Sequence, residues 1–277
     1  MKPPKFDYAA PAELHEAMAL LQSSDADVRI LAGGQSLMPA LNLRLANPSL
    51  LVDLGRIGQL RGIRLLDDGS IVTGAMTRHR DFEMNPLVRE HLPLVHAAVK
   101  GIAHPPIRSR GTIGGSLANA DPAADWPALC LACGATLSLQ SPQGIRMVKA
   151  GDFSTGFFST SLAAGEILTE IRFPAWPRER RWGLQKFARR RGDFAIAGVV
   201  VVADSMQWTI VVYGAEEKPS SFAIDGDLRP TTFREVASRV ANDTSTRSDI
   251  HASAQFRREL VEVLTRRALE EAFHDEN

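Results

Sequence analysis

The sequence is poor in cysteine and has no long apolar run. Two cysteines in 277 residues are too few for a secreted disulfide framework and for an iron–sulfur cluster, which takes four thiolates. The longest apolar run, residues 195–203, is far shorter than the roughly 20 residues of a spanning helix. The first eight residues hold no apolar signal core. We therefore expect a cytoplasmic protein without a membrane span.

The chain also has no excess of charge of either sign. It contains 32 Lys and Arg against 32 Asp and Glu, so its formal net charge is zero. That balance argues against nucleic acid and against an anionic membrane as partners. Hydrophobic residues make up 44% of the chain, which is ordinary globular composition and excludes disorder as the main state.

The pattern of apolar residues predicts an α+β fold, because strands and helices are mixed without strict alternation. Residues 174–183, rich in Pro and Arg, mark the expected boundary between two domains. Residues 104–125 form a long stretch without periodicity, which is usually functional in a compact domain. The expected helices span 11–22, 86–103, 126–135, 231–241 and 253–273; the expected strands and hairpins span 28–31, 50–54, 62–75, 135–148, 166–173 and, as a three-strand meander, 184–214.

Two glycine motifs are the candidates for ligand binding. The first, residues 32–36 (AGGQS), follows a predicted strand, and the second, residues 111–116 (GTIGGS), lies in the aperiodic stretch. Glycine lets the backbone approach a ligand closely, and successive amides in such a turn form an anion-binding nest. A tight turn without a ligand is the alternative for each motif. Neither motif fits the dinucleotide fingerprint or the phosphate loop of nucleotide hydrolases, so classical NAD and NTP sites are disfavoured.

The two motifs with their flanks resemble those of a known family. Residues 31–54 and 103–128 are similar to the two FAD loops of the FAD-binding medium subunits of molybdenum hydroxylases, the family of carbon monoxide dehydrogenase and xanthine dehydrogenase. The spacing of about 80 residues between the loops also matches. Further similarity lies in FDYAAP near the start and in residues 186–201 and 249–272, so the resemblance covers nearly the whole chain.

The resemblance implies a fold and a set of cofactor-binding residues. The fold is a two-part FAD-binding domain of the vanillyl-alcohol-oxidase-like (PCMH) type at 1–176, split near 55–60, then a smaller α+β domain at 177–277 with a three-stranded antiparallel sheet. Phe194 stands where the family often places an aromatic residue near the flavin, although a strand-core role is equally open. The implied FAD-binding residues are Ala32, Gly33, Gly34, Gln35, Ser36, Ile102, Thr112, Ile113, Gly114, Gly115, Ser116, Asp125, Leu168 and Lys186.

Within that set, the resemblance gives several residues distinct roles. The two glycine loops contact the FAD diphosphate, Asp125 bonds the ribityl chain, and Leu168 and Lys186 lie near the flavin ring. The sequence departs from the family at Asn119, often His, and at Asp125, often Glu, which affects the fine geometry of the ribityl contacts.

The implied function is an oxidoreductase subunit that carries FAD and transfers electrons. A large partner subunit holds a molybdenum cofactor, a small one holds two [2Fe-2S] clusters, and the chain passes electrons to an external acceptor, within a single or doubled heterotrimer. No catalytic residue and no metal site are expected on this chain. A stand-alone flavin oxidase and a scaffold without FAD remain as alternatives. The oxidase would need a base of its own, and neither the histidines nor the two tyrosines, Tyr8 and Tyr213, offer a convincing candidate.

Two further clusters are interpreted as structural. Cys130 and Cys133 form a C-x-x-C pair within an apolar helix, and two ligands are too few for a structural zinc, so packing is the favoured role. Residues 189–191, three consecutive arginines, are expected to be mainly a solvated cluster. The substrate of the molybdenum site and the identity of the acceptor do not follow from this sequence.

Overall fold

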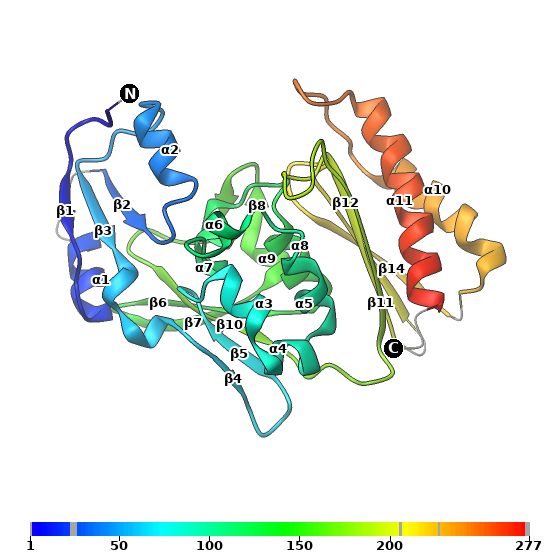
Figure 1. Ribbon diagram of the computed structural model, residues 1–277, viewed down its shortest axis with the longest axis horizontal. Helices are drawn as coiled ribbons and strands as arrows, with labels where there is room; N and C mark the ends of the chain where they lie inside the picture. Colours follow the sequence, from blue (N-terminus) through cyan, green and yellow to red (C-terminus); the bar gives the residue numbers. More distant parts are fainter. Residues whose placement is uncertain (1, 23–26, 205–206, 227, 275–277) are drawn as a thin grey trace.

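The computed structural model describes residues 2–22, 27–204, 207–226 and 228–274. Within these residues the strands form four sheets, and the three larger ones follow one another along the molecule in chain order (Figure 1). The mixed α+β architecture agrees with the sequence prediction. In the described part of the chain, no helix is both long and apolar enough to cross a membrane.

The N-terminal part is a small parallel sheet covered by a helix. Strand order is β1-β3-β2, with parallel pairing throughout. Helix α1 buries Leu14, Ala17 and Met18 against it, at the three- and four-residue spacing of one helical face. The elements are β1 (Asp7–Ala9), α1 (Leu14–Gln22), β2 (Val28–Leu31), α2 (Leu37–Asn42) and β3 (Leu50–Asp53). Strand β2 therefore runs directly into the first glycine motif.

The central part is a five-stranded antiparallel sheet in the order β4-β5-β10-β6-β7. Helices on its surface enclose the largest hydrophobic core of the described chain. Its strands are β4 (Ile63–Leu65), β5 (Ile71–Gly74), β6 (Thr136–Ser141), β7 (Gly144–Lys149) and β10 (Ile167–Phe173), and its helices are α3 (His79–Met84), α4 (Pro86–His91), α5 (Pro93–Val99), α6 (Pro105–Arg108), α7 (Ile113–Asn119), α8 (Asp125–Ala132) and α9 (Ala150–Phe153). A short hairpin, β8 (Ser154–Gly156) with β9 (Ser159–Thr160), follows α9.

Two sequence predictions in this part are wrong in detail. The single helix expected over 86–103 is two helices, α4 and α5, because Pro93 cannot continue the helix and instead begins the next one. The stretch 104–125 contains helices α6 and α7, each started by a local signal. Pro105 occupies the first turn of α6, and Thr112 caps α7.

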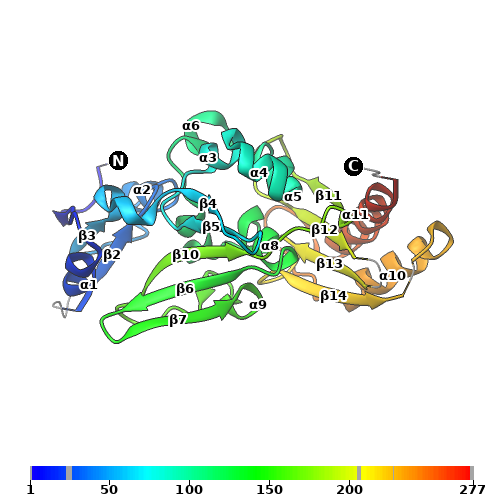
Figure 2. The same cartoon turned by 90° about the horizontal axis from the view of Figure 1, so that it is seen from below.

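The C-terminal sheet has four antiparallel strands rather than the three expected. Its order is β11-β12-β13-β14, with β11 (Arg181–Phe187), β12 (Ala197–Ala203), β13 (Gln207–Tyr213) and β14 (Ser220–Asp225). Strand β14 is a half-exposed edge strand, so its sequence lacks the continuous valine run that identifies β12. Helices α10 (Phe233–Asp243) and α11 (Ala254–His274) cover one face of the sheet (Figures 1 and 2).

The valine run of β12 is buried on both faces. Val199 and Val201 pack against α10 and α11, whereas Val200 and Val202 join the core of the central part. A strand buried on both sides needs apolar residues at every position. The C-terminal sheet is therefore joined to the central part through a shared hydrophobic core.

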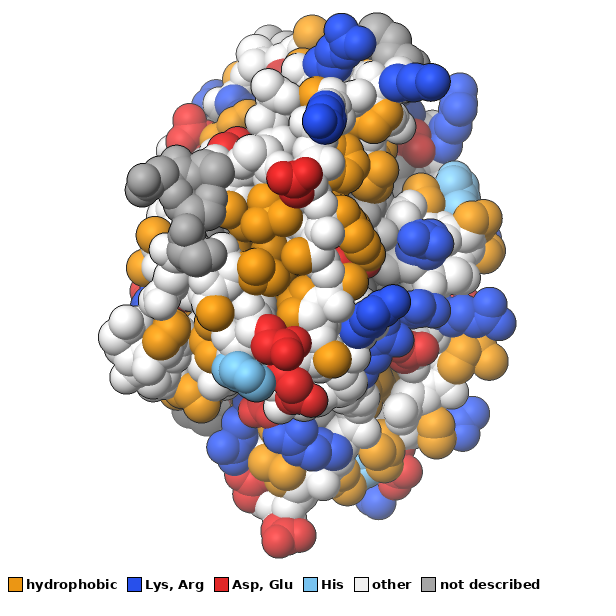
Figure 3. Space-filling model, turned by 90° about the vertical axis from the view of Figure 1, so that its left-hand side faces the viewer, with side chains coloured by type: hydrophobic (Ala, Val, Ile, Leu, Met, Phe, Trp, Pro, Cys, Tyr) orange, Lys and Arg blue, Asp and Glu red, His pale blue; other side chains and the backbone are white. Residues whose placement is uncertain are grey.

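The side of the molecule formed by the N-terminal part carries a mixed surface. Figure 3 shows hydrophobic side chains in the middle of this face, with both basic and acidic side chains around them. This mixture of charges matches the zero net charge of the sequence.

Candidate functional site

A cavity of about 1070 Å³ is lined by residues from all three parts of the fold. Its size lies at the upper end of the range for ligand pockets. Of the residues predicted to bind the cofactor, Ile113 and Lys186 do not line this cavity. The lining includes the other twelve: Ala32, Gly33, Gly34, Gln35, Ser36, Ile102, Thr112, Gly114, Gly115, Ser116, Asp125 and Leu168.

The first glycine motif is a loop between β2 and α2 with free backbone donors. Gly34 has φ of +72°, a conformation that favours glycine. The Gln35 side-chain amide donates to the Gly33 carbonyl at 3.0 Å and holds the loop in place. Within the described residues, the backbone amides of 33–36 donate to no protein acceptor. These amides are suited to bind an anionic group such as a phosphate.

The second glycine motif is the start of a helix rather than a free nest. Thr112 caps α7 by accepting a hydrogen bond from the Gly115 amide at 3.1 Å. The Ile113 amide donates to Thr77 and the Gly114 amide donates to Ala75, at 3.1 and 2.8 Å. Ile113 itself is fully buried in the core. The amides of Ile113, Gly114 and Gly115 are therefore already paired within the protein, and the nest geometry expected for this motif is wrong.

The glycines of both motifs allow close contact between protein segments. A Cβ on Gly33 would lie 2.5 Å from the Arg110 carbonyl oxygen and 2.7 Å from the Gly111 Cα. A Cβ on Gly114 would lie 2.5 Å from the Ala75 Cβ. Contacts this short do not occur, so each glycine is needed where two backbones touch. Gly33 thus brings the first motif against the start of the second, whereas Gly114 lets the second motif pack against Ala75.

Asp125, Lys186 and Tyr213 form a buried polar cluster across the boundary between the central and C-terminal parts. The Lys186 Nζ atom lies 3.1 Å from the Asp125 carboxylate and also donates to the Gly101 carbonyl at 3.0 Å. The Tyr213 hydroxyl donates to Asp125 Oδ1 at 2.8 Å. Burial raises the pKa of the Asp125 carboxyl, while Lys186 and Tyr213 act in the opposite direction.

This cluster depends on a small residue on the neighbouring strand. A Cβ on Gly198, which pairs with Tyr213 across β12 and β13, would lie 2.2 Å from the Tyr213 ring. Gly198 therefore makes the space that the tyrosine ring fills. Sequence analysis did not identify Tyr213 as a site residue. The signal that could have pointed to Tyr213 is Gly198, a glycine in a strand that otherwise consists of alanine and valine.

His79 and Trp126 form a second buried pair in the cavity wall. The Trp126 Nε1–H group donates to His79 Nδ1 at 2.9 Å. Because the indole can only donate, His79 Nδ1 carries no proton and the neutral ring is protonated at Nε2. Burial, with a smaller contribution from Arg108, lowers the pKa of His79 to about 4. His79 is therefore neutral at physiological pH.

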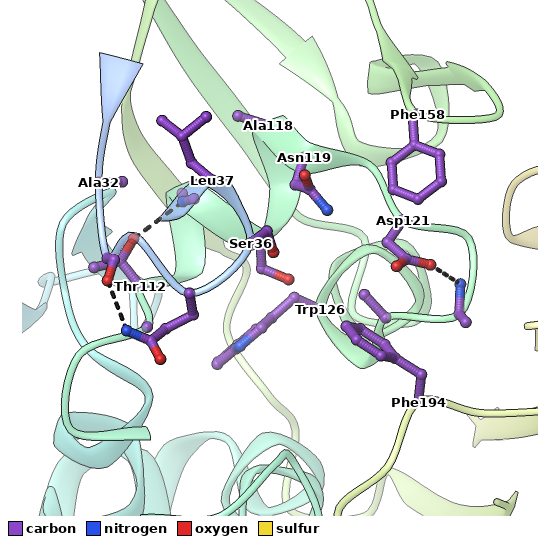
Figure 4. Close-up of a pocket in the computed structure, with 18 of the residues that line it drawn as sticks. Ala32, Ser36, Leu37, Thr112, Ala118, Asn119, Asp121, Trp126, Phe158 and Phe194 are labelled. Atoms are coloured by element: carbon purple, nitrogen blue, oxygen red, sulfur yellow. Dashed lines mark hydrogen bonds between the residues drawn. The ribbon is translucent and has the colours of Figure 1, made fainter. Parts of the chain in front are cut away.

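The end of the cavity away from the glycine motifs is aromatic. Figure 4 shows Ala32 and Thr112 at one end, and Phe158 and Phe194 at the other, on either side of Asp121. Phe158 comes from the β8–β9 hairpin and Phe194 from the loop after β11. Phe158 and Asp121 carried no sequence signal as ligands, because only the tertiary structure places them on the cavity.

The cysteine pair and the arginine cluster lie in different surroundings. Cys130 and Cys133 are both free and buried in the central core, and burial raises the pKa of the Cys133 thiol to about 12. Arg189 lines the cavity, while Arg190 and Arg191 are exposed outside its lining. Among the described residues, no cluster of three or more His, Cys, Asp or Glu side chains has the geometry to hold a metal ion.

The arrangement fits an elongated ligand that carries an anionic group and, at a distance from it, a flat aromatic ring. Unpaired amides meet the ligand at the glycine end, and phenylalanine rings meet it at the other. The buried polar side chains of Asp125 and His79 are already paired with protein groups. FAD has these features, so the cavity is suited to hold it.

Comparison with known proteins identifies the family. Residues 4–176 match the FAD binding domain in molybdopterin dehydrogenase, and residues 182–272 match the CO dehydrogenase flavoprotein C-terminal domain. The chain is 42% identical to the nicotine 6-hydroxylase medium subunit of Paenarthrobacter nicotinovorans, covering 98% of this chain and 99% of that protein. It is 45% identical to the carbon monoxide dehydrogenase medium chain of Hydrogenophaga pseudoflava, over 73% of this chain and 70% of that one.

Solved structures agree with this assignment. The structure of carbon monoxide dehydrogenase from Hydrogenophaga pseudoflava superposes with a TM-score of 0.93 at 35% identity, covering 99% of both chains. Quinoline 2-oxidoreductase from Pseudomonas putida 86 gives 0.92 at 35% identity, covering 98% of both chains. This chain belongs to the FAD-binding medium subunits of the molybdenum hydroxylases, a family of multi-subunit oxidoreductases.

Proposed function

We propose that this chain binds FAD in the cavity between its three larger sheets and relays electrons from a small partner subunit with two [2Fe-2S] clusters to an external acceptor. In this proposal a large partner subunit holds the molybdenum cofactor and the substrate site, and the three chains form a single or doubled heterotrimer in the cytoplasm. The domains are residues 1–176 and 177–277. FAD supplies the redox chemistry, and the protein supplies binding and orientation.

The observation that carries this proposal is the polarity of the cavity. The unpaired amides of 33–36 are suited to the diphosphate, and the aromatic end is suited to a flat ring. Ser36 and Ser116 add hydroxyl groups to the lining near the glycine motifs. The two free cysteines are compatible with a reducing compartment and leave the clusters to another chain.

Three candidate bases for a stand-alone oxidase are already engaged in hydrogen bonds. Such an enzyme needs a base in the substrate pocket. Tyr213 is fully buried with its hydroxyl bonded to Asp125, and the ring of His79 is bonded to Trp126. Tyr8 is exposed on β1, where its hydroxyl donates to Asp53 at 2.6 Å.

The test is to purify the chain alone and together with its partners. We expect the chain alone to bind one FAD, to show the absorption bands of oxidised flavin, and to oxidise no purine, aldehyde or N-heteroaromatic compound with an artificial dye. Affinity purification from the native host is expected to recover two partner chains, one with iron and one with molybdenum. Turnover by the chain alone would contradict the electron-transfer role, and a chain without flavin affinity would contradict FAD binding.

A further inference from the structure

The aromatic end of the cavity exposes three phenylalanine rings. Phe157, Phe158 and Phe194 have exposed fractions of 51%, 50% and 58%, and all three line the cavity. Phe158 and Phe194 approach from different segments on either side of Asp121 (Figure 4). Several large apolar side chains exposed around one cavity indicate a binding surface, because scattered single residues are the norm elsewhere.

Phe158 is also held in an unfavourable backbone conformation. Its φ is +49°, in the left-handed region, where a bulky residue other than glycine is rare. Residues in such conformations persist only where the surrounding structure imposes them, and they concentrate at functional sites. Gly156, two residues earlier in the same hairpin, does not have a positive φ. The hairpin tip therefore has phenylalanine, and not glycine, at the position whose backbone conformation favours glycine.

Contacts on both sides hold the tip of the hairpin. The rings of Phe157 and Phe158 pack edge to face, with centroids 4.7 Å apart and planes at 88°. The Arg247 guanidinium, from the segment between α10 and α11, lies over the Phe157 ring at 5.2 Å. The tip is thus fixed to the C-terminal part, the same part that contributes Phe194.

We propose that Phe158 is a cofactor-binding residue whose ring contacts the isoalloxazine ring of FAD, opposite Phe194. This inference rests on the proposed function. The dimethylbenzene half of the isoalloxazine is apolar in both face and edge and suits an end walled by phenylalanine rings, whereas adenine carries ring nitrogens and an amino group around its edge. The strained backbone at Phe158 is retained because it directs the ring into the cavity.

The inference predicts that one substitution weakens cofactor binding without unfolding the free chain. Phe158→Gly removes the ring and its edge-to-face contact with Phe157 but relieves the strained conformation, so the apoprotein is expected to melt close to the parent temperature. The same variant is expected to bind FAD about fivefold more weakly, since a ring contact of this kind contributes on the order of a fivefold change in affinity. Phe158→Tyr keeps a ring and is expected to retain the parent affinity.

The experiment measures the dissociation constants of FAD and of ADP by titration of the full-length chain, together with the visible circular dichroism of bound flavin. Phe158→Gly is expected to change the flavin dichroism and leave ADP binding as in the parent. Phe256→Ala, which removes a half-exposed ring on α11 outside the cavity, is the control and is expected to change neither.

Three outcomes separate the possibilities. Parent-like FAD affinity in Phe158→Gly would overturn this inference and leave the proposed function intact. An equal loss of ADP affinity would place Phe158 against the adenine and overturn the assignment to the isoalloxazine. A parent chain that takes up no FAD would contradict the proposed function, and this inference with it.

Discussion

Replacing Lys186 by methionine tests how the C-terminal sheet is attached to the cavity wall. The Lys186 ammonium lies 3.1 Å from the Asp125 carboxylate, and both side chains are largely buried, with exposed fractions of 16% and 11%. The substitution keeps most of the side-chain length but leaves a buried carboxylate without its cation. Removing one partner of such a pair costs about 3–5 kcal/mol of unfolding free energy.

The structure places the expected loss toward the lower part of that range. Asp125 still accepts a hydrogen bond from Tyr213 after the substitution, so we expect about 3 kcal/mol. Asp125 can also reduce the cost by taking up a proton. Its pKa is already raised by burial, and loss of the ammonium raises it further. A carboxyl whose pKa is raised in the folded state contributes most to the unfolding free energy at low pH, where it is protonated, and that contribution is lost as pH rises. The loss caused by Lys186→Met is therefore expected to be larger at pH 8 than at pH 5.

Urea unfolding of the full chain at both pH values measures this loss. Lys149→Met, at an exposed lysine on β7, is the control and is expected to change the unfolding free energy by less than about 0.5 kcal/mol. Adding Asp125→Asn to Lys186→Met removes the unpaired charge, so the double variant is expected to be more stable than Lys186→Met alone. Because Asp125 already neutralises the ammonium in the parent, we expect Lys186→Met to have a large effect on the unfolding free energy and a small effect on the flavin potential. A loss equal to that of the control, or one independent of pH, would refute the reasoning.

Three further predictions follow from other contacts. The pKa of His79 is lowered to about 4, so protonation of this ring is expected to reduce the unfolding free energy by up to about 3 kcal/mol as pH falls from 6.5 through 4. Urea midpoints of His79→Gln are expected to lack this part of the pH dependence, and a pH dependence equal to that of the parent would contradict the prediction. Gly33→Ala places a Cβ 2.5 Å from the Arg110 carbonyl oxygen and forces the two loops apart, so it is expected to weaken FAD binding about tenfold or more. Gly58→Ala, whose Cβ meets nothing within 4 Å, is the control and is expected to bind FAD as the parent does in the same titration. Arg257→Met removes a buried guanidinium that donates to two backbone carbonyls and an aspartate. Urea unfolding is expected to show a loss of about 3–5 kcal/mol in the unfolding free energy. A loss below that of an exposed Arg→Met control would show that other contacts hold the segment between α10 and α11.

Local patterns in the sequence determined the elements and the place of the cavity. The valine run of β12, the apolar spacing of α1 and the glycine pair after β2 each act over a few residues, so each is readable from the chain. The resemblance to a family supplied the order of the parts. Strand β14 was missed because an edge strand exposes half of its side chains and needs no continuous apolar pattern.

Only the tertiary structure decided which residues meet. Gly33 and Gly114 look alike in sequence, but one contacts the loop at Arg110 and the other contacts Ala75, just after β5. Lys186 and Tyr213 lie 61 and 88 residues from Asp125 along the chain, and no local signal joins the three. A buried carboxylate is stabilised by the donors that packing brings within hydrogen-bonding distance, and here those donors come from the C-terminal sheet packed against helix α8. The sequence by itself therefore specified the kind of site, and the packing of three sheets decided which side chains complete it.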